Sequence, residues 1–164
     1  TISYVDTHPV TNVLYMLQMI IGGAPGGTAG GVKVTAAAIT FLLFKAELTG
    51  QTEVTFRNRV IANKVIKQTF TILIFFFTIL TVGYMALLLF EPHHNPLALL
   101  FEAISAIATV GVSMDLTPQL STGGRIVIMV LMFVGRVGPI TVLLSLLQRK
   151  RKDIHYAQTT INMG

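Results

Sequence analysis

The feature that most constrains this chain is the way its charged residues are distributed. Only 12% of the 164 residues are charged, and a soluble domain usually carries about twice that fraction. The charges are missing from long apolar runs, of which Gln68–Phe90 is the clearest. That run holds about 23 uncharged residues, enough for a helix to cross a hydrocarbon core of about 30 Å. The sequence therefore predicts an all-α membrane protein.

A second apolar run, at 96–108, is too short to cross. Asn95 can cap a helix here, and Pro96 suits its first position. The run has about 13 residues, which at roughly 1.5 Å per residue give a helix of about 20 Å. The segment after it, 109–113 (TVGVS), reads as extended chain, which is tolerated at membrane depth where it lines a cavity or is buried in protein. Backbone carbonyls there, with the negative end of the helix dipole, would suit a dehydrated monovalent cation. A buried amphipathic helix followed by an ordinary turn is the alternative.

A glycine-rich stretch at 22–31 separates the apolar runs 13–21 and 34–44. It holds six of the 14 glycines of the chain. The phosphate-binding patterns G-x-x-x-x-G-K-[ST] and G-x-G-x-x-G are both absent. The four-residue spacing of the glycines also permits close helix packing, but Pro25 and the glycine density disfavour a continuous helix. We expect a flexible intramembrane loop that could act as a gate.

Lysine and arginine gather at 45–67 and at 149–152. The positive-inside rule places both segments in the cytoplasm and leaves 1–12, 91–95 and 114–124 outside. The short helix then re-enters from the external face. This arrangement predicts a multi-pass protein of the plasma membrane with a cytoplasmic C-terminus, and it favours membrane anchoring over nucleic-acid binding.

Two ionisable residues fall within apolar segments. Arg136 lies in the last predicted crossing, 125–148, where exposure to lipid is unfavourable, so it should face a cavity or the carbonyls of the glycine loop. Glu102 lies in the short helix, and we expect a structural carboxylate whose partner lies in sequence outside this chain. There is no cysteine, and no catalytic or metal-ligand spacing is present, so the sequence predicts neither an enzyme nor a cofactor site.

Three motifs carry a resemblance to a known family. They are GGAPGGTAGGVKVT at 22–35, SAIATVGVS at 105–113 and FVGRVGP at 133–139. Together they resemble the C-terminal part of the Ktr/Trk/HKT superfamily of potassium transporters, and most closely the membrane subunit of its Ktr branch. The chain does not begin with Met, and we expect a C-terminal fragment with further sequence before Thr1.

The resemblance implies four repeats of helix, re-entrant pore loop and helix around one central pore. Residues 1–44 then end the third repeat, 45–67 form a cytoplasmic connector, 68–148 form the fourth repeat and 149–164 a cytoplasmic tail. The fourth repeat divides into a helix (68–90), a pore helix (96–108), a filter (109–113) and a last helix (125–148).

The resemblance also implies roles for individual residues. The selectivity filter is formed by Thr109, Val110, Gly111, Val112 and Ser113, with K⁺ held by the backbone carbonyls of Thr109, Val110 and Gly111. The gate is formed by Gly22, Gly23, Gly26, Gly27, Thr28, Gly30, Gly31 and Arg136.

Members of this superfamily form homodimers and bind a cytosolic, nucleotide-binding regulatory ring. The resemblance therefore implies both partners here, with the nucleotide on the ring and the tail ending at Met163 and Gly164 near the dimer interface. K⁺ is the expected transported ion, and the single filter glycine leaves Na⁺ open. Two rival functions remain: a membrane scaffold whose glycine loop packs helices, and an anion carrier that uses half-helix N-termini and Arg136.

Overall fold

The computed structural model describes residues 7–26, 30–51, 53–57 and 59–138. The predictions for Gly27, Thr28, the end of the last helix (139–148) and the tail (149–164) lie outside these residues. The elements follow in the order α1 (Pro9–Ile21), α2 (Val34–Leu48), β1 (Thr55–Phe56), β2 (Arg59–Val60), α3 (Asn63–Phe90), α4 (Pro96–Ile107), a 3-10 turn (Thr117–Gln119) and α5 (Thr122–Val137).

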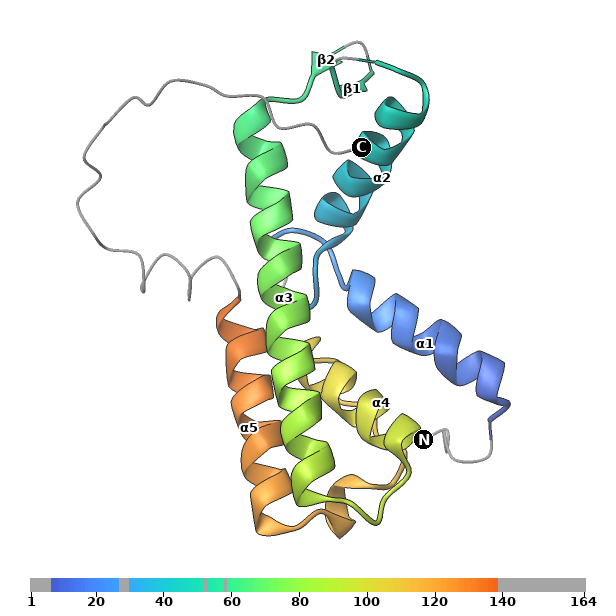
Figure 1. The fold of residues 1–164 in the computed structure, drawn as a ribbon, viewed down its shortest axis with the longest axis vertical. Coiled ribbons are helices and arrows are strands. Elements are labelled where there is room, and N and C mark those ends of the chain that lie inside the picture. Colours follow the sequence, from blue (N-terminus) through green and yellow to red (C-terminus); the bar gives the residue numbers. More distant parts are fainter. Residues whose placement is uncertain (1–6, 27–29, 52, 58, 139–164) are drawn as a thin grey trace, which may run out of the picture.

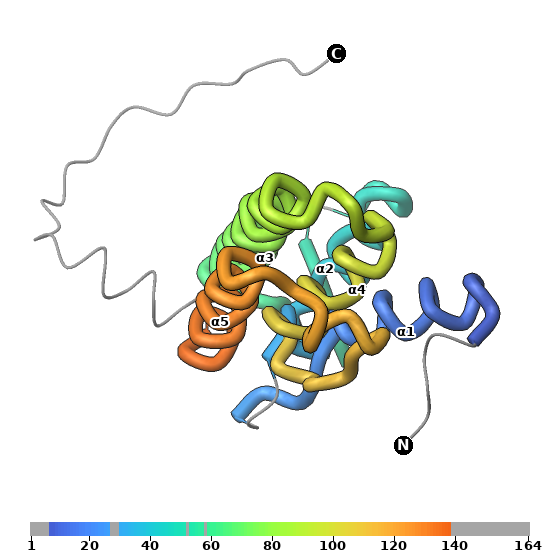
Figure 2. Tube along the Cα trace, turned by 90° about the horizontal axis from the view of Figure 1, so that it is seen from below, coloured from blue at the N-terminus to red at the C-terminus, as the bar shows by residue number. Residues whose placement is uncertain are grey.

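Helix α3 is the longest element and forms the axis of the fold. Its 28 residues give a length of about 42 Å, and within the described residues it is the one helix long and apolar enough to cross a membrane. It begins before the predicted position 68, because Lys64 and Lys67 in its first turns are good helix formers. Helix α5 lies beside it in both views (Figures 1 and 2).

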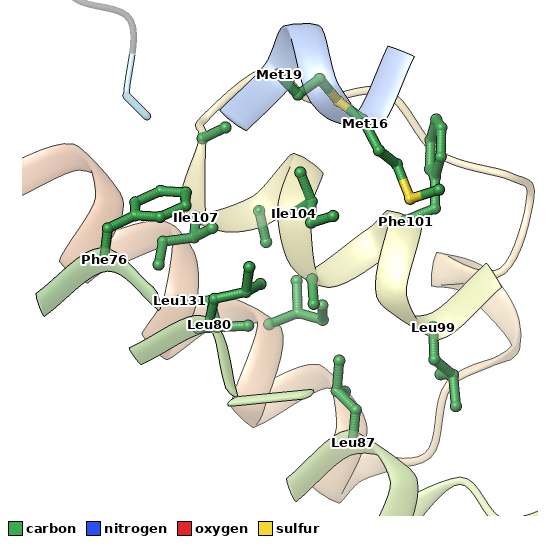
Figure 3. Packing of buried hydrophobic residues seen from close by; sticks show 14 of the residues in the cluster. Met16, Met19, Phe76, Leu80, Leu87, Leu99, Phe101, Ile104, Ile107 and Leu131 are labelled. Carbon is green, nitrogen blue, oxygen red and sulfur yellow. The ribbon is translucent and has the colours of Figure 1, made fainter. Parts of the chain in front are cut away.

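Helix α4 is the most buried element, and it packs against α1, α3 and α5. Eight of its 12 residues are buried, and the apolar ones among them share one core cluster with Met16 and Met19 of α1 and Phe76 of α3 (Figure 3). The Asn95 side chain accepts a hydrogen bond from the Leu97 amide, and Pro96 occupies the first turn, both as the sequence predicts. The helix ends at Ile107, one residue before the predicted end, because Ala108 is its cap.

The non-helical stretch between α2 and α3 is shorter than the predicted connector 45–67, whose first and last residues lie in the two helices. Helix α2 continues to Leu48, and two short antiparallel strands pair Thr55 with Val60. Both of these residues are β-branched and favour extended backbone. The fold is mostly helical, which confirms the coarse fold class, while the hairpin was not predicted.

The segment between α3 and α5 begins and ends at neighbouring positions, at the C-terminal end of α3 and the N-terminal end of α5. Glu91, which follows α3, accepts a hydrogen bond at 2.6 Å from the backbone N–H of Ser121, which precedes α5. Between them α4 runs toward the middle of α3 and the chain comes back (Figure 1). A small cavity near the end of α4 is lined by Phe76 and Ile107 among others. Phe76 lies halfway along α3, so α4 ends level with the centre of the long helix.

Candidate functional site

The C-terminal end of α4 is held between two glycines. A Cβ atom on Gly30, in the glycine loop, would lie 2.7 Å from the carbonyl oxygen of Ala108, and one on Gly135, in α5, would lie 2.0 Å from that of Ile107. Both distances are far below an ordinary carbon–oxygen contact of about 3.3 Å. Glycine is therefore required on both sides, and the loop and α5 meet at the end of α4.

The glycine loop (residues 22–31) is closed at its base by backbone hydrogen bonds. The Val32 amide donates to the Ile20 carbonyl at 3.0 Å, and the Val34 amide donates to the Gly23 carbonyl at 3.2 Å. Gly22 has a φ of +70°, and a Cβ there would lie 2.4 Å from the Gly30 carbonyl oxygen. The described loop residues are not helical, so the glycine spacing does not form a continuous helix-packing face.

Backbone conformation in the segment 109–113 is unusual. Thr109 has a φ of +54° and Gly111 a φ of +83°, while Val110 between them lies outside the left-handed region. In a regular strand, successive carbonyls point to opposite sides. A left-handed residue at every second position rotates the intervening peptides, so that carbonyls can gather on one side of the chain. A left-handed, β-branched threonine is strained, and such strain persists where the surroundings impose it.

Hydrogen bonds supply that constraint at Thr109. Its hydroxyl oxygen accepts a hydrogen bond from the Gly30 amide at 2.7 Å, across 79 positions in the sequence. Its own amide donates to the Ala106 carbonyl at 3.1 Å, and the next amide, of Val110, donates to the Ser105 carbonyl at 3.0 Å. The glycine loop and the end of α4 therefore fix the start of the segment together.

The far end of the segment is held by side chains of α4. The Ser105 hydroxyl donates to the Val112 carbonyl at 2.5 Å, which turns that carbonyl toward the helix. Glu102 is 4% exposed and accepts hydrogen bonds from the Ser113 hydroxyl, the Met114 amide and the Thr117 hydroxyl. Glu102 therefore has partners within this chain, where the sequence suggested one outside it. The hydroxyl-bearing residues that follow the apolar helix in the sequence could have indicated these partners.

A cavity of about 360 Å³ lies between the glycine loop, α1 and the segment 109–113. Met19 and Gly22, at the end of α1, and Ala108, the cap of α4, all line it. The carboxyl-terminal ends of two helices therefore border one space, and each carries a partial negative charge of about half a unit. The two helix dipoles thus favour a cation over an anion in this cavity. Its complete lining is Tyr15, Gln18, Met19, Gly22, Gly23, Ala108, Thr109, Val110 and Val112.

The predicted site residues fall into three groups. Those brought together around the end of α4 and its cavities are Gly22, Gly23, Gly30, Gly31, Thr109, Val110, Gly111, Val112 and Ser113. Gly26 lies apart, with nothing within 4 Å of a Cβ built on it. Arg136 directly follows Gly135, so its backbone is one residue from the contact with Ile107, and its side chain is exposed. The described part of α5 ends at Val137, because Gly138 has a φ of +84°.

Comparison with known proteins places this chain among cation transport proteins. The family described as "Cation transport protein" (TrkH) matches residues 1–153. The chain is 33% identical over 154 residues to the Ktr system potassium uptake protein B of Bacillus subtilis, covering 94% of this chain and 34% of that protein. It is 34% identical over 170 residues to the potassium/sodium uptake protein NtpJ of Enterococcus hirae, covering 100% of this chain and 38% of that protein.

A third relative is the Ktr system potassium uptake protein B of Vibrio alginolyticus, 31% identical over 158 residues. That match covers 96% of this chain and 34% of the relative. The chain thus spans little more than a third of the length of these proteins, all of which are named as transport proteins and none as an enzyme. With the family matched over nearly its whole length, the chain belongs to the TrkH family of cation transport proteins.

Proposed function

We propose that this chain supplies one filter segment and the gate of a potassium uptake transporter. Residues 109–113 form a quarter of the selectivity filter, in which the carbonyls of Thr109, Val110 and Gly111 coordinate K⁺. The glycine loop, together with Arg136, forms the gate. Na⁺ transport or Na⁺ coupling is compatible with the single filter glycine, and NtpJ carries both ions in its name.

The observation that carries the proposal is the hydrogen bond from the Gly30 amide to the Thr109 hydroxyl. It joins two non-helical segments at the level of the middle of α3. If α3 spans the bilayer, this level is the bilayer midplane, where irregular backbone is stable only if it is buried in protein or lines a cavity. A filter with a movable loop beneath it meets that condition.

The two rival functions have less support. An anion carrier would direct helix N-termini at its substrate, whereas α1 and α4 turn their carboxyl-terminal ends toward the shared cavity. A membrane scaffold would need the loop only to pack helices, and Gly30 does pack against the end of α4. This rival leaves unexplained the left-handed backbone at Thr109 and Gly111.

From the same family membership we further propose the domain organisation of this chain and the partners of the full-length protein. The domains are those predicted above: 1–44 ends the third repeat, 45–67 is a cytoplasmic connector, 68–148 is the fourth repeat and 149–164 is a cytoplasmic tail. The full-length protein spans the plasma membrane several times, forms a homodimer and binds a cytosolic nucleotide-binding regulatory ring. The name "Ktr system" of two relatives implies a transporter of several components.

The test is rubidium uptake and growth at low external potassium in a bacterium that lacks its own potassium uptake. It would express the full-length parent protein, intact or carrying Gly111→Ser. A Cβ at Gly111 meets nothing within 4 Å, but its φ of +83° strains any other residue. The substitution therefore perturbs the carbonyls of the segment without overpacking.

Gly50→Ser is the matched control. Gly50 has a φ of +65° and equally open surroundings, and it lies in the turn after α2. We expect Gly111→Ser to raise the potassium requirement or admit sodium, and Gly50→Ser to leave both unchanged. Identical uptake by the two variants would exclude Gly111 from the filter. Absence of uptake by the intact protein, when it is present in the membrane, would favour a rival function.

A further inference from the structure

Glu102 is the one buried carboxylate in the middle of an apolar helix among the described residues. A carboxylate at that depth is strongly unfavourable unless hydrogen-bond donors compensate for its lost hydration. Three donors do so. Its Oε1 accepts from the Ser113 hydroxyl and, at 3.0 Å, from the Met114 amide, and its Oε2 accepts from the Thr117 hydroxyl at 2.9 Å.

All three donors come from the few residues that follow the strained part of the segment 109–113. The Thr117 hydroxyl also lies 3.1 Å from the Ser113 hydroxyl, so the carboxylate and two hydroxyls form one closed network. Ser105, three residues after Glu102, binds the Val112 carbonyl from the same face of α4. The returning chain is thus fastened to α4 in order, Val112 to Ser105 and Ser113–Met114 to Glu102.

This arrangement leaves a space behind the segment. A cavity of about 240 Å³ is lined by Glu102, Ser105, Gly111 and Thr117, and on the α5 side by Met132, among others. Packing alone therefore does not hold the segment against α5. Its distance from α4 is set by the hydrogen bonds to Ser105 and Glu102.

We propose that Glu102 is a positioning residue that sets the geometry of the outer end of the filter and thereby the preference for K⁺ over Na⁺. This inference rests on the proposed function of residues 109–113. The carboxylate is suited to the task because both of its oxygens are acceptors and its charge strengthens all three bonds, whereas a glutamine has one acceptor oxygen and no charge. The consequence of losing it is a loosened segment from Val112 to Met114, and hence coordinating carbonyls that are less well placed for one ion size.

The experiment measures rubidium uptake, its competition by sodium, KM and maximal rate in the full-length parent protein, with membrane abundance measured for each variant. The variants are Glu102→Gln, which keeps the shape, and Thr117→Val, which keeps the shape of Thr117 and removes its hydroxyl. Loss of a hydrogen bond to a charged group predicts a fall of about tenfold in the preference for rubidium over sodium. Thr117→Ser keeps the hydroxyl and should restore the preference.

Glu91→Gln is the matched control. Glu91 is also a buried carboxylate, 6% exposed, but it binds Ser121 at the start of α5 rather than the filter segment. We expect it to leave the ion preference unchanged. If Glu102→Gln does not reach the membrane, the comparison of Thr117→Val with Thr117→Ser decides the question.

A merely structural role for Glu102 would lower abundance or maximal rate while leaving the ion preference intact, and that result would overturn the proposal. The parallel Gly111→Ser variant separates a test of the filter assignment from a test of the positioning role of Glu102. If Gly111→Ser changes the preference and the Glu102 and Thr117 variants do not, the filter stands and the positioning role falls. If none of the three changes it, the filter assignment itself falls.

Discussion

Substitution of Gly135 by alanine tests the packing on which the whole site depends. A Cβ at Gly135 would lie 2.0 Å from the Ile107 carbonyl oxygen and 2.8 Å from its carbon. To restore an ordinary carbon–oxygen contact of about 3.3 Å, α5 and the end of α4 would have to separate by about 1.3 Å. The position of the Cβ is fixed by the backbone of α5, and the oxygen belongs to the backbone of α4, so no side-chain rotation can relieve the contact.

The expected change in the free energy of unfolding follows from two opposing effects. Alanine is favoured over glycine in a helix by about 1 kcal/mol, and overpacking a well-packed interface costs about 1–3 kcal/mol. Because the clash is with backbone, we expect the upper end of that range and a net destabilisation of about 2 kcal/mol. Displacement of α4 should also lower rubidium uptake, since Thr109 follows its cap directly.

Gly123→Ala is the matched control on the same helix. A Cβ there meets the ring of Phe90 at 2.5 Å, but that ring is 55% exposed and can rotate away. A helix-propensity gain then remains, smaller than the interior value of about 1 kcal/mol because Gly123 lies in the first turn of α5. Thermal unfolding of the purified full-length protein should place Gly135→Ala well below Gly123→Ala. Equal midpoints for the two variants, with equal rubidium uptake, would refute the tight contact between α4 and α5.

Two further predictions concern single hydrogen bonds. Thr109→Val removes the acceptor of the Gly30 amide, and the loss of about 1 kcal/mol should speed hydrogen exchange of that amide about fivefold. Thr109→Ser keeps the hydroxyl and should leave the exchange rate unchanged. Equal exchange rates in the two variants would contradict the hydrogen bond between Gly30 and Thr109. Hydrogen bonding from the side chain and backbone of Ser121, aided by His94 and Arg125, holds the pKa of Glu91 below its ordinary value of 4.5. The stability that this carboxylate confers is therefore present above pH 4.5 and is lost as the pH falls through its lowered pKa. The thermal unfolding midpoint of the intact protein should fall at acid pH by an amount that Glu91→Gln does not show. If Glu91→Gln shows the same fall, other groups cause it.

The local breaks in this fold could be predicted from sequence because each has a local cause. Asn95 and Pro96 fix the start of α4 through a side-chain cap and a residue that needs no N–H. The density of glycine around Pro25 excludes a regular helix there. These effects act within a few residues, so the local sequence is enough to predict them.

The contacts that build the site could not be predicted in the same way. The bond between Gly30 and Thr109 joins residues 79 positions apart, and nothing in either local sequence specifies the other. The requirement for glycine at position 135 comes from the carbonyl of Ile107, which is backbone and leaves no mark on sequence. Glu102 is intermediate: a carboxylate in an apolar helix needs donors, and Thr109, Ser113 and Thr117 are the first three hydroxyls beyond the helix, but the sequence does not say which of them it binds.

The distribution of these contacts suits a filter that stays in place while a gate moves. On the α4 side, Glu102 and Ser105 bind the returning chain through one hydroxyl-to-carbonyl bond and three bonds to a carboxylate, and bonds to a charged group are worth about 1.5–3 kcal/mol each. On the loop side, the structure defines a neutral bond from the Gly30 amide to Thr109, worth about 1 kcal/mol. By these hydrogen bonds, the segment is therefore held more strongly by α4 than by the described part of the loop. If residues 109–113 are the filter and the glycine loop is the gate, as proposed above, a loop that separates from Thr109 would leave the far end of the segment still bound to Glu102 and Ser105.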